Sequence, residues 1–340
     1  MLGPGTGTED VERPMDNASL LKIDSLRKFF TVKRGFPNPV KLTVKAVDGV
    51  SFDVKQRESF GLVGESGCGK STVGRAILRL VEPDAGRVSF KGEDILSADK
   101  RQMKRLRQKM QIVFQDPYSS LNPRRKIGKT LEEPLRVHGL GTSEEIRYTI
   151  SRLLEEVGLP PEILDKFPHE FSGGQRQRIA IARALVFKPE LIIADEPVSA
   201  LDVSIQSQIL MLLQKLQREY NLSFVFVAHD LAVVRYFCHR VAIMYLGRIV
   251  EQGTPDQLFD NPLHPYTRML LAASPIPDPR ARRQLTRLEG EVASAIETPS
   301  GCYFHPRCPN RTDLCGREYP EWLNVSVDRG VACHLHGRQG

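Results

Sequence analysis

Alternating apolar and polar positions mark the N-terminal part of the chain. Between residues 21 and 54, the segments LLKIDSLRKFF and KLTVKAVDGVSFDV alternate in this way, which predicts antiparallel strands. The segment TVKRGFPNP between them contains glycine and prolines and predicts a loop. We therefore expect an antiparallel β subdomain in this region.

Short apolar runs later in the chain follow a different pattern. The runs at residues 59–63, 191–194 and 223–228 are almost uninterrupted, which is typical of buried parallel strands. Helical stretches are predicted around residues 175–187 and 204–220. Strands and helices in this alternation predict an α/β core.

The pattern changes after about residue 253, where prolines become dense. A domain boundary is therefore expected near residues 255–262. The predicted divisions are a disordered N-terminal tail (1–20), a core domain (21–260) and a small C-terminal extension (261–340).

Composition places the chain among soluble globular proteins of about two domains. It has 340 residues, of which 41% are hydrophobic and 26% charged. The longest hydrophobic run, at residues 241–246, is far shorter than the roughly 20 residues of a membrane-spanning helix. The N-terminal segment has no basic flank followed by an apolar core, so no export signal is expected and the chain is predicted to stay in the cytosol.

The chain has a basic excess, with 48 Lys and Arg against 41 Asp and Glu. Nucleic acid, an anionic membrane surface, nucleotide phosphates and an ordinary solvated surface all fit this excess. The segment Lys100–Lys109 carries six basic residues and no acidic one, with Met103, Leu106 and Met110 at helical spacing. It predicts a basic amphipathic helix that lies near a membrane or is simply solvated.

The segment GESGCGKS at residues 64–71 fits the pattern G-x-x-x-x-G-K-[ST]. It follows the predicted strand 59–63 and opens an amphipathic helix that runs to about Leu80. Its glycines permit a turn in which backbone N–H groups point at a phosphate, and the helix N-terminus adds partial positive charge. Lys70 is expected to reach the β- and γ-phosphates, and Ser71 to offer its hydroxyl to Mg²⁺.

A pair of acidic residues follows the apolar run at 191–194. The strand brings Asp195 to the carboxyl edge of the sheet, where ligands of α/β proteins bind. Asp195 can hold Mg²⁺ there, generally through water. Glu196 is placed to orient or deprotonate an attacking water.

A second glycine-rich helix start lies at FSGGQ, residues 171–175, before the alanine-rich segment IAIARAL. Ser172 is a candidate N-cap, and the two glycines expose backbone N–H groups to an anion. This site is too far along the chain to be simply part of the first loop. We therefore expect two copies to face each other, with the SGGQ segment of one closing on the nucleotide of the other.

These segments resemble the motifs of ATP-binding subunits of ABC transporters, and the resemblance covers residue 21 to the C-terminus. The motifs occur in that family's order: the phosphate loop, Gln115 in IVFQDPYSSLNPR, FSGGQ, LIIADEP, SALD and His229 in VAHD. The resemblance implies an α/β fold, with a P-loop ATPase core, an antiparallel β subdomain, a helical subdomain at about 116–181 and a cysteine-rich C-terminal extension. It also implies an ATPase that is coupled to transmembrane transport.

The resemblance assigns further roles to single residues. It implies that Gln115 touches Mg²⁺ and senses the membrane partner, that His229 contacts the γ-phosphate, and that residues 199–202 link two ATP sites. Phe30 matches the position of an aromatic that stacks on adenine, where Tyr is more usual. The expected catalytic residues are Lys70, Gln115, Glu196 and His229, and the expected Mg²⁺ ligands are Ser71, Gln115 and Asp195. The expected nucleotide contacts are Phe30, Gly64, Glu65, Ser66, Gly67, Cys68, Gly69, Lys70, Ser71, Thr72, Ser172, Gly173, Gly174 and Gln175.

Three segments resemble the dipeptide and oligopeptide importer branch: HPYTRMLLAASPIP, SGCYFHPRCP and DPYSSLNPR. The last falls where the helical subdomain should dock a coupling helix of the membrane subunit. The branch implies short peptides as cargo, although nickel, glutathione and oligosaccharide importers carry similar subunits. It also implies a peripheral location at the cytoplasmic face of the plasma membrane. The expected partners are two integral membrane permease subunits, an extracytoplasmic substrate-binding protein and a second ATPase subunit, favoured to be a paralogue rather than another copy.

A soluble chromosome- or ribosome-associated ATPase is the competing class, because it shares the phosphate loop and SGGQ. Chromosome-associated ATPases insert hundreds of coiled-coil residues between these motifs, whereas about a hundred residues separate Ser71 from Ser172 here. The translation-factor type carries two ATPase domains, and this chain carries one. Nucleic acid is therefore not expected as a partner.

Four of the six cysteines lie in the last forty residues, at Cys302, Cys308, Cys315 and Cys333. In a reducing cytosol this clustering favours a metal over disulfides. There is no C-x₂-C pair, and the wide spacing and Pro309 favour a [4Fe–4S] cluster, as does the importer resemblance. Zn²⁺ stays open, with His305, His334 and His336 as substitute ligands, and so do free thiols. A metal here would stabilise a tail too poor in apolar surface to fold alone.

Overall fold

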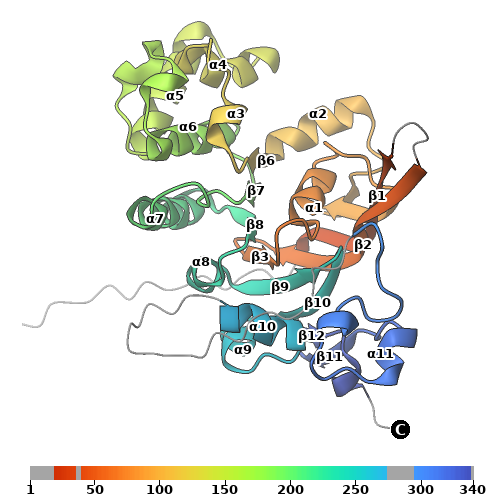
Figure 1. The fold of residues 1–340 in the computed structure, drawn as a ribbon. Coiled ribbons are helices and arrows are strands. Elements are labelled where there is room, and N and C mark those ends of the chain that lie inside the picture. Colours follow the sequence, from red (N-terminus) through yellow and green to blue (C-terminus); the bar gives the residue numbers. More distant parts are fainter. Residues whose placement is uncertain (1–18, 36–39, 274–294, 338–340) are drawn as a thin grey trace, which may run out of the picture.

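The structure is a computed structural model that describes residues 19–35, 40–273 and 295–337. Within these residues the strands form two sheets (Figure 1). The tail predicted at 1–20 lies almost wholly outside the described residues. None of the described helices is long and apolar enough to cross a membrane.

The smaller sheet is antiparallel and has the strand order β2-β1-β4-β5. Its strands are β1 (Ser19–Arg34), β2 (Val40–Lys55), β4 (Ala85–Phe90) and β5 (Glu93–Asp94). The loop predicted from TVKRGFPNP is shorter than expected, because Thr31 pairs with Thr43 and Arg34 with Val40. The β-branched residues Thr31 and Val32 favour strand structure, and β1 continues to Arg34, just before Gly35.

The larger sheet forms the centre of the molecule and has the strand order β11-β12-β10-β9-β3-β8-β7-β6. Its strands β6, β7, β8, β3 and β9 run parallel, and β10, β12 and β11 continue it in antiparallel pairs. Every residue of β3, β7 and β8 is buried, in agreement with the apolar runs in the sequence. The bounds are β3 (Ser59–Val63), β6 (Met110–Val113), β7 (Leu191–Asp195), β8 (Ser223–Ala228), β9 (Arg240–Tyr245), β10 (Arg248–Gly253), β11 (Leu323–Ser326) and β12 (Arg329–Val331).

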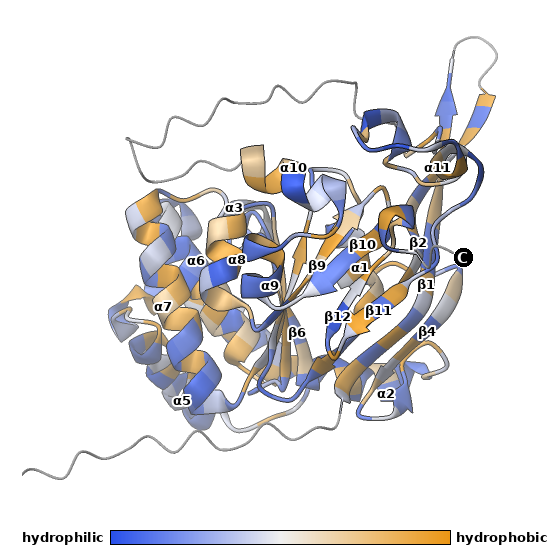
Figure 2. Ribbon diagram, turned by 90° about the horizontal axis from the view of Figure 1, so that it is seen from below, coloured by the Kyte–Doolittle hydropathy of each residue, from blue (hydrophilic) through white to orange (hydrophobic). Residues whose placement is uncertain are grey.

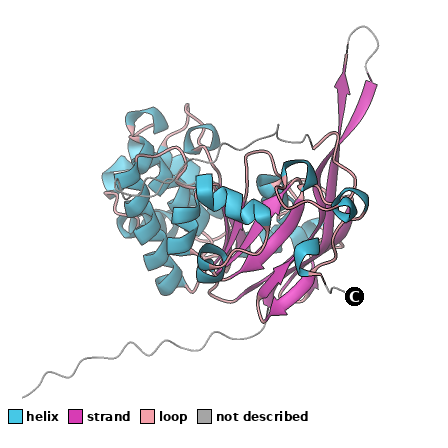
Figure 3. Ribbon diagram, turned by 60° about the horizontal axis from the view of Figure 1, so that its bottom comes forward, coloured by secondary structure: helices cyan, strands magenta, loops and turns pink. Residues whose placement is uncertain are grey.

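Most helices gather beside the strands, and one group stands apart as a lobe (Figures 1 and 3). This lobe contains α3 (Pro117–Ser120), α4 (Ile127–Val137), α5 (Ser143–Glu156) and α6 (Gly173–Leu185). The lobe spans Pro117 to Leu185, and the division of the chain with a helical subdomain at about 116–181 stays a prediction. Outside the lobe, the helices that precede α9 are α1 (Lys70–Ile77), α2 (Lys100–Lys109), α7 (Val203–Tyr220) and α8 (Leu231–Phe237).

The basic segment Lys100–Lys109 forms α2, as its spacing predicts. A capping box between Asp99 and Gln102 starts the helix, and Met103 and Leu106 are buried beneath it. All six of its basic residues are exposed, and the Arg107 guanidinium also donates hydrogen bonds to the carbonyl of Leu78.

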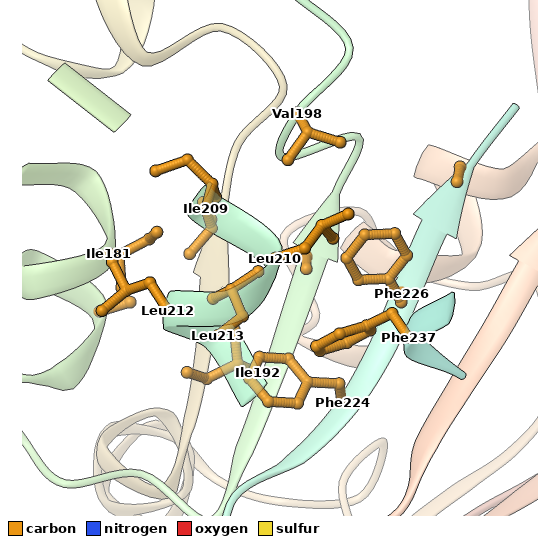
Figure 4. Close-up of a cluster of buried hydrophobic side chains, with 14 of the residues drawn as sticks. Ile181, Ile192, Val198, Ile209, Leu210, Leu212, Leu213, Phe224, Phe226 and Phe237 are labelled. Atoms are coloured by element: carbon orange, nitrogen blue, oxygen red, sulfur yellow. The ribbon is translucent and has the colours of Figure 1, made fainter. Parts of the chain in front are cut away.

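Two hydrophobic cores hold the sheets and helices together. One lies between the two sheets, where the rings of Phe52 and Phe60 stack at 4.6 Å between centroids. The other lies between the larger sheet and the helices, where leucines of α7 pack on Phe224 and Phe226 (Figure 4). Hydrophobic residues accordingly line the strands, whereas the outer helices alternate between apolar and polar faces (Figure 2).

The C-terminal residues do not form a core of their own. Strand β12 pairs with β10, with Glu251 opposite Val331, so the extension lengthens the central sheet. Tyr266 and Phe304 are 0% and 1% exposed and belong to the main core. Burial of these side chains anchors the extension to the rest of the molecule. Helix α9 (Pro255–Asp260) comes just before the extension, whose own helices are α10 (Pro265–Ala273) and α11 (Asp313–Arg317).

Candidate functional site

The loop between β3 and α1 has the tight curvature that its sequence predicts. Gly67 and Gly69 have positive φ values of 78° and 105°, which glycine adopts at little cost. A Cβ on Gly64 would lie 2.1 Å from the Met244 carbonyl oxygen, and one on Gly69 would lie 1.9 Å from that of Ala46. Backbone of β9 and β2 therefore presses on the loop, and larger residues do not fit there.

Lys70 occupies the inside of this loop. Its side chain is buried, and its Nζ donates hydrogen bonds to the carbonyl oxygens of Gly64 at 2.8 Å and Glu65 at 2.9 Å. An ammonium in this place can exchange these carbonyls for phosphate oxygens, which accept more strongly because they are charged.

Ser71 and Asp195 provide a matched pair of oxygens. The Ser71 hydroxyl donates to Asp195 Oδ1 at 2.7 Å, and Asp195 is 2% exposed at the end of β7. Burial raises the pKa of the Asp195 carboxyl, although the hydrogen bond from Ser71 opposes this shift. A hydroxyl and a carboxylate side by side fit the oxygen ligands that Mg²⁺ prefers.

Glu196 joins two other predicted residues at the same edge of the sheet. Its Oε2 accepts a hydrogen bond from Gln115 Nε2 at 3.0 Å and lies 3.1 Å from His229 Nδ1. Its backbone is left-handed, with φ of 46°, and its N–H donates to the Val227 carbonyl. Such a conformation is costly for a residue with a side chain and is typical of functional sites.

These groups share one pocket of about 440 Å³. Nine predicted residues line it: Ser66, Gly67, Gly69, Lys70, Ser71, Thr72, Gln115, Glu196 and His229. Residues from four separate parts of the sequence therefore converge on this pocket. Asp195 does not line it, but its carboxylate accepts a hydrogen bond from Ser71, which does.

Three predicted residues of the loop do not line the pocket with their side chains. Gly64 faces Lys70 with its carbonyl oxygen, and the Glu65 carboxylate turns to Arg307 instead. The Cys68 thiol is 3% exposed, and burial raises its pKa, so Cys68 fills space beside the loop.

Phe30 lies on β1 and does not line the pocket. Its side chain is 38% exposed, and Lys28 Nζ lies 5.4 Å from the ring centroid. An exposed ring remains available to a planar ligand.

The segment of residues 172–175 also stands apart from the pocket. Ser172 caps α6, and Gln175 Oε1 accepts from the Ser172 N–H at 3.0 Å, which completes a capping box. Helix α6 belongs to the helical lobe, whereas α1 lies against the strands (Figure 1). One chain thus does not bring its two glycine-rich helix starts together.

The four C-terminal cysteines lie near one another but are not arranged as a metal site. The Cys302 N–H donates to the Cys315 carbonyl. Burial raises the pKa of the Cys302 thiol to about 11, with smaller upward contributions from Cys315, Cys333 and Cys308. Among the described residues no three His, Cys, Asp or Glu side chains are close enough to hold a metal ion. The four thiols have suitable chemistry for a metal, but their present spacing does not fit one.

The three C-terminal histidines engage carbonyl oxygens. His305 Nδ1 lies 2.9 Å from the carbonyl oxygen of Cys302, His334 Nε2 lies 2.9 Å from that of Glu318, and His336 Nε2 lies 3.1 Å from that of Leu263.

Sequence reasoning missed two residues that contact the phosphate loop from the extension. Tyr266 Oη accepts a hydrogen bond from the Glu65 N–H at 3.0 Å, and Arg307 pairs with the Glu65 carboxylate. Both lie in the segments HPYTRMLLAASPIP and SGCYFHPRCP, but no local pattern in those segments signals contact with a loop about 200 residues earlier.

The fold and the pocket define a P-loop nucleotide-binding protein. The family described as ABC transporter matches residues 47–199, and the one described as oligopeptide/dipeptide transporter, C-terminal region, matches residues 250–315.

Similar proteins cover nearly the whole chain. The oligopeptide transport ATP-binding protein AppF of Bacillus subtilis is 47% identical over 321 residues, which span 94% of this chain and 98% of that protein. The probable peptide ABC transporter ATP-binding protein y4tS of Sinorhizobium fredii is 50% identical over 93% of this chain and 90% of its own length.

Solved structures share the fold. The dimeric bacterial ABC transporter cassette MJ0796 has a TM-score of 0.61 and 31% identity, and covers 69% of this chain and 98% of its own. The cbiO1 subunit from Clostridium perfringens has a TM-score of 0.60 and 29% identity, and covers 72% of this chain and 91% of its own.

The chain belongs to the ATP-binding subunits of ABC transporters, in the oligopeptide and dipeptide transporter branch. Its activity is therefore ATP hydrolysis coupled to transport. The predictions of an α/β ABC ATPase fold and of this family are confirmed.

Proposed function

We propose that this chain powers the import of short peptides as one ATPase subunit of a membrane transporter. The observation that carries the proposal is that one chain holds both a pocket lined by the phosphate loop and the C-terminal region matched by oligopeptide/dipeptide transporters. The names of relatives such as AppF point to the same cargo.

Two permease subunits would transmit the ATPase motion across the membrane, and an extracytoplasmic binding protein would deliver the peptide. The ATPase would lie at the cytoplasmic face and dock a coupling helix in the segment DPYSSLNPR. Tyr118 in this segment is 49% exposed, which suits a docking contact.

We propose a head-to-tail pair of ATPase subunits as the catalytic unit. In the single chain, Ser172 to Gln175 lie outside the pocket, and Ser172 and Gln175 cap helix α6, so the N–H groups at this helix start suit a nucleotide held by another subunit. The related cassette MJ0796 is described as dimeric. A paralogue is the favoured partner, and a second copy is the alternative.

Within each pocket, Lys70 and the loop N–H groups would bind the β- and γ-phosphates, and Ser71, Asp195 and Gln115 would hold Mg²⁺. Mg²⁺, when bound, would neutralise charge on the phosphates. Glu196 would take the proton of the attacking water, and His229, 3.1 Å away, would contact the γ-phosphate. Phe30 would stack on adenine.

We also propose that the four cysteines bind a metal, with a [4Fe–4S] cluster favoured over Zn²⁺. Support comes from the four thiols of the extension, which are buried or half-buried. They lie close enough for the charge of one to affect the pKa of another. Because the thiols are too widely placed as they stand, metal binding requires them to approach. The role would be structural.

Anaerobic purification with iron and zinc analysis tests this cluster. About four iron atoms per chain and visible charge-transfer absorption are expected. One zinc ion and a colourless protein would identify the alternative metal, and a folded metal-free chain would refute both.

Uptake of a labelled dipeptide or tripeptide by the reconstituted transporter tests the cargo. Uptake is expected to require ATP and to stop with Lys70→Met in this chain. The exposed Lys215→Met variant, far along α7 from the pocket, is the matched control. ATP-dependent uptake of nickel, glutathione or an oligosaccharide without peptide uptake would contradict the peptide proposal.

A further inference from the structure

The C-terminal extension contacts the phosphate loop at Glu65. The Arg307 guanidinium donates two hydrogen bonds to the Glu65 carboxylate, Nη1 to Oε2 and Nη2 to Oε1, each at 3.0 Å. The Glu65 N–H donates to Tyr266 Oη, also at 3.0 Å. Side chain and backbone of one loop residue are thus held from two separate segments of the extension.

Burial makes this contact rigid. The Arg307 side chain is 1% exposed, and its guanidinium carbon lies 5.9 Å and 6.0 Å from the ring centroids of Tyr245 and Phe304. Tyr266 packs on both of these rings, with centroids 4.6 Å and 5.4 Å away. A guanidinium in such surroundings needs a paired carboxylate, and Glu65 supplies it in the bidentate geometry that favours arginine over lysine.

The same loop residue holds the catalytic lysine. Lys70 Nζ donates to the Glu65 carbonyl at 2.9 Å, so two contacts lead from Arg307 through Glu65 to Lys70. The ion pair also keeps the Glu65 carboxylate out of the pocket that Ser66 lines. A carboxylate released from Arg307 would be free to approach that pocket and repel the phosphates of a nucleotide.

We propose that Arg307 is a positioning residue for ATP, acting with Tyr266 through Glu65. The two residues fix the start of the phosphate loop and keep a negative charge away from the triphosphate. The extension is therefore a working part of the nucleotide site, in addition to any metal that its cysteines bind. The contacts of Arg307 and Tyr266 with Glu65 affect ATP affinity, whereas Glu196 acts in the chemical step.

ATPase kinetics of the assembled transporter test this proposal through the split between KM and kcat. Arg307→Lys keeps the charge but loses the bidentate geometry, and should raise KM for ATP about tenfold with kcat within about twofold. Tyr266→Phe removes one hydroxyl and leaves the ring packing, and should raise KM about threefold.

The matched control is Arg317→Ala, an exposed arginine of the same extension with no contact to the loop, which should leave KM unchanged. Loss of folded protein lowers apparent kcat without moving KM, so the KM shift separates positioning from damage. If Arg307→Lys does not fold, Tyr266→Phe decides alone.

A double-variant cycle sharpens the test. Because Glu65→Gln removes the repulsive charge, adding it to Arg307→Lys should recover about half or more of the lost affinity for a fluorescent ATP analogue. Folded Arg307→Lys and Tyr266→Phe proteins with unchanged KM would overturn the proposal, and so would additive losses in the double variant.

Discussion

The two glycine-rich helix starts of this chain have similar sequence patterns but different structural surroundings. The phosphate loop is pressed by the backbone of β2 and β9, and the Cys68 carbonyl accepts from the Gly247 N–H at 2.9 Å. The start of α6 has an exposed Ser172 and a capping box built from its own residues. Backbone from two strands presses on the first site, whereas at the second the side chains of Leu201 and Ile205 approach Gly173 and Gly174 beside the local capping box. An anion site of the second kind is suited to a ligand brought by another subunit.

Glu196→Gln, in the pocket formed by the phosphate loop, should have the largest effect on ATP turnover. The amide keeps the shape but cannot take a proton, so ATP turnover should fall about 10³-fold while ATP binding stays within about threefold. The closed pair of subunits should accumulate with ATP, as measured by size-exclusion chromatography. Glu190→Gln, at the opposite end of β7, serves as the control. Normal turnover in Glu196→Gln would remove the proposed base.

Ser172→Ala should show that the two helix starts act on different nucleotides. Turnover of the assembled transporter should fall about 10²-fold, because a donor to the partner's nucleotide is lost. ATP affinity of the isolated chain should not change, because Ser172 does not line its pocket. A loss of ATP affinity in the isolated chain would show that the two sites are not separate.

Substitution of Gly64 and Gly67 by alanine should separate two costs in the phosphate loop: a steric clash with neighbouring backbone at Gly64, and a strained backbone conformation at Gly67. At Gly64 a Cβ meets the Met244 carbonyl oxygen at 2.1 Å, and unfolding free energy should fall by about 3 kcal/mol. At Gly67 nothing lies within 4 Å, and only the positive φ opposes alanine, at about 1 kcal/mol. Chemical denaturation measures both values. Equal losses would mean that backbone packing does not shape the loop.

Asp195→Asn should produce the smallest change, an increase in stability. Burial raises the pKa of Asp195, so the folded state favours the protonated carboxyl. The carboxyl therefore destabilises the fold as pH rises through its raised pKa, and an uncharged amide should raise the metal-free melting temperature by about 2 °C at pH 7. The gain should vanish at pH values below the ordinary pKa of Asp. A lower melting temperature at pH 7 would contradict this assignment.

Much of the site was predictable because its residues sit in short local patterns. Lys70, Ser71 and Asp195 follow apolar strands, and the α/β rule places the carboxyl ends of such strands at one edge. Strands β9 and β12 were not predicted as strands. Five residues of β9 fall within the longest apolar run, whose length alone does not distinguish a strand from a helix. Strand β12 has three residues and depends on its pairing with β10.

By itself the sequence determined the family, the phosphate loop and the residues that can perform ATP chemistry, because these depend on residue type and spacing within a few positions. Tertiary structure decided the place of the extension and the partner of Glu65. Nothing local to Arg307 indicates its distance from Glu65, because 242 residues separate them. Only the burial of Tyr266 and Phe304 in the main core brings the two charges together, and burial depends on the whole fold.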